Sequence, residues 1–202
     1  FGLLQQPVVA RRFGLADDDL TQVHDWLHGA GVHWGLDGAH RTGFGVPGEE
    51  RHTLADGLAR LFLGHALPPG VGEPFAGLLP GADIGGAAAD VLGRLWPFAS
   101  ALQRWQARLA VPNPPADWVA LLRQACDDFI AAEGDERADL RELQAAIAAL
   151  GDEMAQAGLT EALPLPVLRL ALQQRLDDPA HGGVPGGSVT ITSMTSLRGL
   201  PY

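Results

Sequence analysis

The sequence predicts a mainly α-helical fold, a helical bundle with one terminal β-strand. Apolar residues recur at helical spacing in seven segments, and prolines and glycines separate these segments. Only residues 188–193 alternate β-branched with small polar side chains, which is typical of a strand. With 202 residues, 47% of them hydrophobic, the chain is long enough to bury the core of an ordinary domain.

Residues 15–37 organise the N-terminal part of the bundle. Three aspartates at positions 17–19 supply an N-cap and negative charge at the start of a helix, and Gly29 and Gly31 end it just before Trp34. Ahead of this helix, residues 6–13 are expected to form a short helix opened by Pro7. The apolar stripe of the longer helix comprises Leu20, Val23, Leu27 and Ala30.

Five further helices follow from apolar periodicity. Pro97 lies in the middle of one of them and predicts a kink there. Residues 37–50 are expected to be irregular, and residues 68–86 to form a long surface loop pinned by Phe75 and by Leu78 and Leu79. The expected helices span residues 53–66, 87–110, 117–132, 135–158 and 165–176.

Charge and composition limit the chemistry that this chain can perform. A net charge of −10 and a pI near 5.0 predict a poor DNA binder when the chain is alone. All 14 basic residues are arginine, which excludes a P-loop or Schiff-base lysine within the chain, although arginine-biased codon usage explains the composition equally well. The adjacent pair Arg11 and Arg12 is either solvated or capping, or it contacts DNA or a partner.

Other compositional features indicate a soluble piece of a longer protein. Cys126 is the single cysteine, so no internal disulfide is available, and we expect it to be a buried small apolar group. We find no signal segment and no apolar run of membrane-spanning length, which predicts a cytoplasmic location and no membrane contact. The chain ends at Tyr202 just after the expected strand, and we therefore expect more polypeptide beyond it.

Two motifs could carry chemistry, and both are weak. His24 and His28 have the i, i+4 spacing of a zinc-binding helix, but no third ligand lies at a recognised distance, so a metalloenzyme remains only an alternative to exposed or capping histidines. Residues 43–48 satisfy G-x-G-x-x-G, yet no strand is expected before them and Pro47 interrupts them. We therefore expect no catalytic residue, metal site or cofactor in this chain.

Three segments resemble the RecC-type gamma subunit of bacterial exodeoxyribonuclease V. These are PVVARRFGL at residues 7–15, GVHWGLD at residues 31–37 and TLADGLARLFLGHAL at residues 53–67. The resemblance implies a helicase fold without helicase chemistry.

The tail at residues 189–202 looks like the superfamily 1 helicase pattern hydrophobic-Thr-x-His-x-x-Lys-Gly-Leu-Glu-aromatic. Thr195 stands where the histidine would be and Pro201 where the glutamate would be, as expected of a degenerate subunit rather than a motor. An ordinary strand and turn is the alternative interpretation. Ser193 and Arg198 stand for the threonine and the lysine, while Gly199, Leu200 and Tyr202 keep their type.

The resemblance implies a domain organisation and a function. Residues 1–187 would be a helical domain at the 2B insertion position of the helicase fold, and residues 188–202 would begin a truncated 2A-like α/β domain. The parent subunit would be a non-motor scaffold that positions DNA and the motor and nuclease subunits during unwinding, degradation and recombinational repair of double-strand breaks. ATP and magnesium would be used by the whole complex. By resemblance, the DNA-binding residues would be Thr195, Ser196 and Arg198.

Two alternatives remain besides the metalloenzyme: a fragment of an active superfamily 1 helicase, and a plain helical protein-interaction module. The expected strand at residues 188–193 has no partner strand elsewhere in this chain. We therefore also expect strand-mediated self-association of the fragment.

Overall fold

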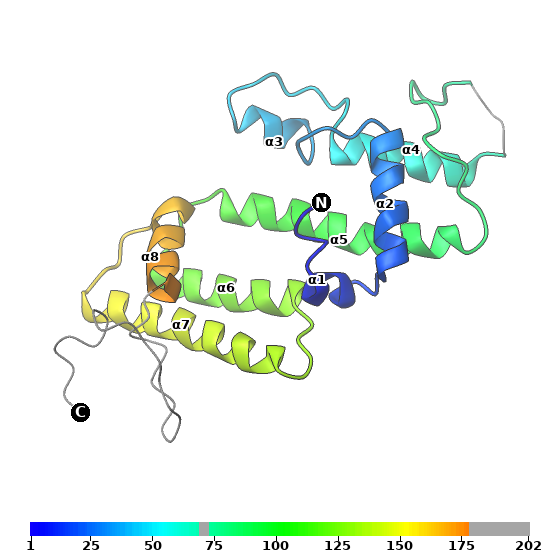
Figure 1. Cartoon of the computed structure of the whole chain (residues 1–202). Coiled ribbons are helices and arrows are strands. Elements are labelled where there is room, and N and C mark those ends of the chain that lie inside the picture. Colours follow the sequence, from blue (N-terminus) through cyan, green and yellow to red (C-terminus); the bar gives the residue numbers. More distant parts are fainter. Residues whose placement is uncertain (69–72, 178–202) are drawn as a thin grey trace, which may run out of the picture.

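The computed structural model describes residues 1–68 and 73–177, and helices dominate this part of the chain (Figure 1). Two isolated β-bridges, Phe75 with Leu78 and Asn113 with Leu163, add to them. The prediction of a mainly α-helical fold is confirmed. The eight helices in these ranges are α1 (Pro7–Arg12), α2 (Asp17–Gly29), α3 (Gly38–Thr42), α4 (Leu54–Ala66), α5 (Ala88–Leu109), α6 (Pro115–Phe129), α7 (Glu136–Gln156) and α8 (Leu165–Asp177).

The expected strand at residues 188–193 lies outside the described residues. The self-association that depends on it and the domain boundary at residue 187 lie outside them as well. Within the described ranges, no helix combines the length and the apolar character needed to cross a membrane.

Helix α3 was missed because five residues are too few to show apolar periodicity. Its signal is the cap: the Asp37 carboxylate accepts a hydrogen bond from the His40 backbone N–H at 2.7 Å. The Thr42 hydroxyl also donates to the Gly38 carbonyl at 3.0 Å. The expectation that residues 37–50 are irregular throughout is therefore wrong for their first third.

Other helix boundaries also differ slightly from those predicted from the sequence, again for local reasons. The N-cap of α2 is Ala16 rather than an aspartate, and the Asp19 carboxylate accepts the Ala16 N–H at 2.9 Å. Helix α6 ends three residues before the predicted residue 132, since the Ala131 N–H bonds to the Val8 carbonyl of α1 at 2.9 Å. Helix α5 continues through Pro97 as one element.

The side chains of Phe75 and Leu79 do not anchor the loop before α5 as predicted, although the Leu79 carbonyl accepts a hydrogen bond from Arg60 Nε at 3.0 Å. Phe75 and Leu79 are 61% and 49% exposed, whereas Ile84 is buried in the first core. Close to it, the Ala82 carbonyl packs directly on Gly64 of α4, where no side chain would fit. The described part of the loop is therefore held from Leu79 onward, through Arg60 and Gly64 of α4 and through the burial of Ile84.

Helix α5 belongs to two hydrophobic cores. Its N-terminal half packs with α1, α2 and α4, and its C-terminal half, through Ala101 and Trp105, packs with α6, α7 and α8. In Figure 1 it runs between α2 and α4 on one side and α6 on the other. The fold is thus two small helical groups that share one long helix.

Aromatic rings join the two cores. Phe13 and Phe98 meet edge to face at 5.3 Å between centroids, and Phe129 lies 6.0 Å from Phe13 and 6.3 Å from Trp105. The Trp105 indole N–H donates to the Asp128 carboxylate at 2.8 Å. Edge-to-face contacts of this kind add stability beyond the area that they bury.

Candidate functional site

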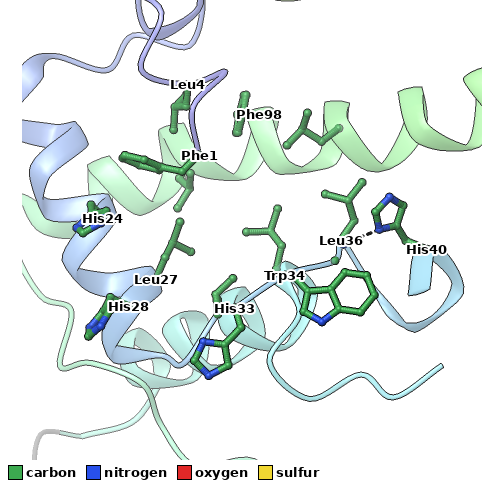
Figure 2. Close-up of a pocket in the computed structure, with 15 residues that line it drawn as sticks. Phe1, Leu4, His24, Leu27, His28, His33, Trp34, Leu36, His40 and Phe98 are labelled. Atoms are coloured by element: carbon green, nitrogen blue, oxygen red, sulfur yellow. Dashed lines mark hydrogen bonds between the residues drawn. The ribbon is translucent and has the colours of Figure 1, made fainter. Parts of the chain in front are cut away.

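A pocket of about 370 Å³ opens between the N-terminal residues, α2, α5 and the segment that follows α2 (Figure 2). Its floor is apolar and buried, since Leu4, Leu95 and Phe98 are each at most 4% exposed. Helices α2, α4 and α5 each carry an apolar stripe at helical spacing, and the three stripes face a common centre. The other lining residues are Phe1, His24, Leu27, His28, Val32, His33, Trp34, Gly35, Leu36, His40, Leu54 and Leu102.

The rim carries imidazoles and two aromatic rings. His24 lies 5.3 Å from the Phe1 ring between centroids, and His40 accepts the Leu36 backbone N–H at 3.3 Å. His33 stacks at 4.9 Å on His52, whose Nδ1 lies 2.8 Å from the Gly31 carbonyl oxygen. The rim can therefore offer donors and acceptors around an apolar recess.

Arg41 of α3 holds the rim in place. Its guanidinium donates to the carbonyls of Glu49 and Arg51 at 2.8 Å each and to that of Trp34 at 3.0 Å. It also lies 4.9 Å from the centre of the Trp34 ring, although the arginine is only 7% exposed. Trp34 remains 48% exposed, so this clamp presents an indole to solvent at the mouth of the pocket. No sequence motif singled out Arg41, because its carbonyl partners become neighbours only through the loop fold.

The pocket is suited to binding an apolar group. His24 lies 3.5 Å from Asp25, but the two side chains are 61% and 76% exposed, so neither is desolvated. Although His24 and His28 both line the pocket, we find no metal-binding group of three or more His, Cys, Asp or Glu residues within 1–68 and 73–177. Within the described residues, the structure therefore brings no further metal ligand to His24 and His28.

The adjacent arginines have separate internal partners. Arg11 bridges α1 to α7, with Nη1 2.7 Å from the Glu136 carboxylate and 2.6 Å from the Ala131 carbonyl. The hydrogen bond from Arg11 lowers the pKa of Glu136, and the same bond raises the pKa of Arg11. Arg12 donates through Nε to the Asp127 carbonyl at 3.1 Å.

The structure gives a different outcome for each of the other residues and motifs that the sequence pointed to. Cys126 is buried, as predicted, and burial raises the pKa of its thiol. Residues 43–48 follow helix α3, so a helix occupies the place where a dinucleotide site would need a strand. The DNA-binding candidates Thr195, Ser196 and Arg198 lie outside the described residues.

Comparisons with known proteins agree with the resemblance. The chain is 28% identical to RecBCD enzyme subunit RecC of Escherichia coli over 201 residues, which are 99% of this chain and 18% of that protein. RecC of Mycolicibacterium smegmatis is 29% identical over 203 residues, again 99% of this chain and 18% of the relative. The chain thus spans less than a fifth of the length of these relatives. The family model for the fourth domain of RecBCD enzyme subunit RecC matches residues 1–180. The chain therefore belongs to the family of RecC fourth domains.

Proposed function

We propose that this chain is a domain of the gamma subunit of an exodeoxyribonuclease V complex. The parent subunit is a non-motor scaffold that positions DNA and the motor and nuclease subunits for unwinding, degradation and recombinational double-strand break repair. The match of the family model to residues 1–180 carries this proposal. Similarity along 99% of the chain to relatives named as RecBCD enzyme subunits supports it.

A scaffold is favoured over a motor by two replaced positions in the tail, whereas the composition excludes only a P-loop site within this chain. The chain contains no lysine and so cannot supply the P-loop lysine that contacts nucleotide phosphates. The residues present therefore do not fit an ATP site of that kind, and ATP and magnesium are assigned to the parent complex. A fragment of an active superfamily 1 helicase is less consistent with the replaced histidine and glutamate positions, Thr195 and Pro201.

The proposed organisation follows the resemblance. Residues 1–187 form a domain at the 2B insertion position, and residues 188–202 begin a 2A-like α/β domain with a strand at residues 188–193. Thr195, Ser196 and Arg198 are then the positions that face DNA. The helical character of the described part supports the first half of this arrangement.

The pocket favours a second candidate, a helical module that binds another protein. Its buried floor of Leu95 and Phe98 and its exposed Trp34 suit an inserted apolar side chain. This candidate differs from the first because it requires no exodeoxyribonuclease complex.

A domain exchange tests the proposal. Residues 1–180 would replace the matched region of Escherichia coli RecC, which is 28% identical to this chain. We expect the chimaera to co-purify with the other subunits of that enzyme and to restore ATP-dependent degradation of linear duplex DNA in cells that lack RecC.

The control is the same chimaera carrying Trp118→Asp, which disrupts the second core and should abolish both results. A chimaera that is soluble and helical by circular dichroism but does not join the complex would contradict the gamma-subunit assignment. It would favour the independent interaction module instead.

A further inference from the structure

A second recess, separate from the pocket of Figure 2, lies where α1 and α6 meet α5. It has a volume of about 370 Å³ and is lined by Arg12, Phe13, Gly93, Arg94, Pro97, Ala101, Arg104 and Asp128. We call it the arginine groove. Three of its eight lining residues are arginines, although the whole chain carries a net charge of −10.

Small residues of α5 form the floor of the arginine groove. Gly93, Pro97 and Ala101 follow one another at a spacing of four, which places them on one helix face. A Cβ atom at Gly93 would meet nothing within 4 Å, so the floor there is open. Pro97 has no N–H, so it cannot donate the helical hydrogen bond to the Gly93 carbonyl. The floor therefore carries no large side chain that would block an incoming group.

One arginine of the groove is already committed. Arg94 forms an ion pair with Asp19 at 3.0 Å and donates to the Gly14 carbonyl at 2.6 Å. Its charge is largely compensated by this pairing. Arg94 therefore serves as a wall of the groove.

The other two guanidinium groups keep donors available. Arg12 uses only Nε, toward the Asp127 carbonyl, and Arg104 has no hydrogen bond or ion pair with any residue of the described ranges. The acid of the groove, Asp128, is held by the Trp105 indole instead of by an arginine. Two exposed arginine heads thus face one recess with unused N–H donors.

We propose that the arginine groove binds an acidic side chain presented by another domain of the same gamma-subunit polypeptide. This inference rests on the proposed function, because it requires the longer parent chain. Guanidinium groups bind carboxylates with paired, charge-assisted hydrogen bonds. The relatives devote 82% of their length to regions outside the match, since the match covers 18%. A segment from those regions is tethered and reaches the groove at a high effective concentration.

The surroundings favour a protein carboxylate over a nucleic-acid phosphate. The net charge of −10 repels a polyanion from solution, and the only aromatic ring of the groove, Phe13, packs against Phe98 and Phe129. Arginine is also one of the residue types enriched where protein surfaces bind each other most strongly.

The absence of lysine provides a direct test in the full-length parent protein. Arg104→Lys and Arg12→Lys each place a single amine in this chain, at the groove, and a carbodiimide joins an amine to a carboxylate in contact with it. Arg141→Lys, on the exposed surface of α7, is the matched control because it lies outside the groove. Mass spectrometry of the purified complex then identifies the residue that is captured.

We expect both groove variants to be linked to an aspartate or glutamate of another domain of the same polypeptide, and the control to give no such product. Capture by a different subunit, capture confined to Asp127 or Asp128, or no capture would overturn the proposal. Protection of the introduced amine by single-stranded DNA would overturn it in favour of a phosphate site. Co-purification of all variants with the other subunits reports separately on the proposed function.

Discussion

At the scale of single residues, Gly64 and Gly93 both follow a leucine within a helix but differ in the space around them. Gly64 of α4 faces the Ala82 carbonyl so closely that a Cβ atom would overlap it, whereas a Cβ atom at Gly93 of α5 meets nothing within 4 Å. Both lie within helices, where alanine is favoured over glycine by about 1 kcal/mol. Only the neighbouring loop distinguishes them.

Gly64→Ala should therefore destabilise the fold by about 1–3 kcal/mol, because the backbone at Ala82 has to move. Gly93→Ala, the matched control, should stabilise it by about 0.5–1 kcal/mol. Urea unfolding followed by circular dichroism measures both free energies of unfolding. Equal effects of the two substitutions would show that the loop does not pack on α4 as described.

The ion pair between Arg11 and Glu136 makes part of the stability depend on pH. Hydrogen bonds from the Arg11 side chain and the Glu133 backbone lower the pKa of Glu136 below its ordinary value of 4.5. A carboxylate with a lowered folded-state pKa contributes stability above the unfolded-state pKa. That contribution is lost as the pH falls through the folded-state value.

Glu136→Gln should thus lower the Tm at neutral pH and have less effect as the pH falls below about 4. Both side chains are about one-third exposed, so added salt should reduce the difference. Glu142→Gln, at an exposed position of the same helix, is the control. Thermal melts across this pH range would contradict the assignment if the two variants behaved alike.

At the scale of elements, one tryptophan fastens α6 to the segment between α7 and α8. Trp118 is fully buried, and its indole N–H donates to the Leu163 carbonyl at 2.8 Å. Asn113 and Leu163 also exchange two backbone hydrogen bonds, at 2.8 and 3.1 Å. This bridge joins α6 to the segment between α7 and α8 beside the second core.

Trp118→Phe should destabilise the chain by about 1–3 kcal/mol, since it removes one hydrogen bond and leaves a small cavity. Trp96→Phe, at a position that is 50% exposed, should change stability by less than about 0.5 kcal/mol. Chemical denaturation of the two variants provides the comparison. A neutral Trp118→Phe would mean that the bridge contributes little.

Helix periodicity identified seven elements, and the structure adds α3. The long helices were predictable because their apolar stripes repeat over several turns, as in α5 and α7. Helix α3 depends on a cap and on the Arg41 clamp, which joins residues from both sides of it. Such an element is formed by its neighbours more than by its own propensity.

At the scale of the whole molecule, charge sets the expected interaction with DNA. With a net charge of −10, the isolated chain should bind single-stranded DNA no more tightly than about 10⁻⁶–10⁻⁴ M at physiological salt, and binding should weaken steeply as salt rises. Fluorescence anisotropy with a labelled oligonucleotide measures this. Nanomolar affinity would require a strong DNA site within the chain and would revise the scaffold proposal.

The sequence by itself determined the helical class, most helix positions, the burial of Cys126 and the family resemblance. These properties reside in local patterns: apolar spacing, caps, and the glycines and prolines between segments. The prediction of seven helices needed no knowledge of which helix touches which.

Only the tertiary structure decided how the arginines and the pockets are used. Arg11 and Arg12 are adjacent in sequence, yet Arg11 pairs with Glu136 whereas Arg12 lines the arginine groove. Arg41 carries no motif and still positions Trp34 at the pocket mouth. The physical reason is that the role of a charged side chain depends on its partners. The Glu136 partner of Arg11 lies on a distant helix, and the carbonyl partners of Arg41 come together only when the loops on both sides of α3 fold.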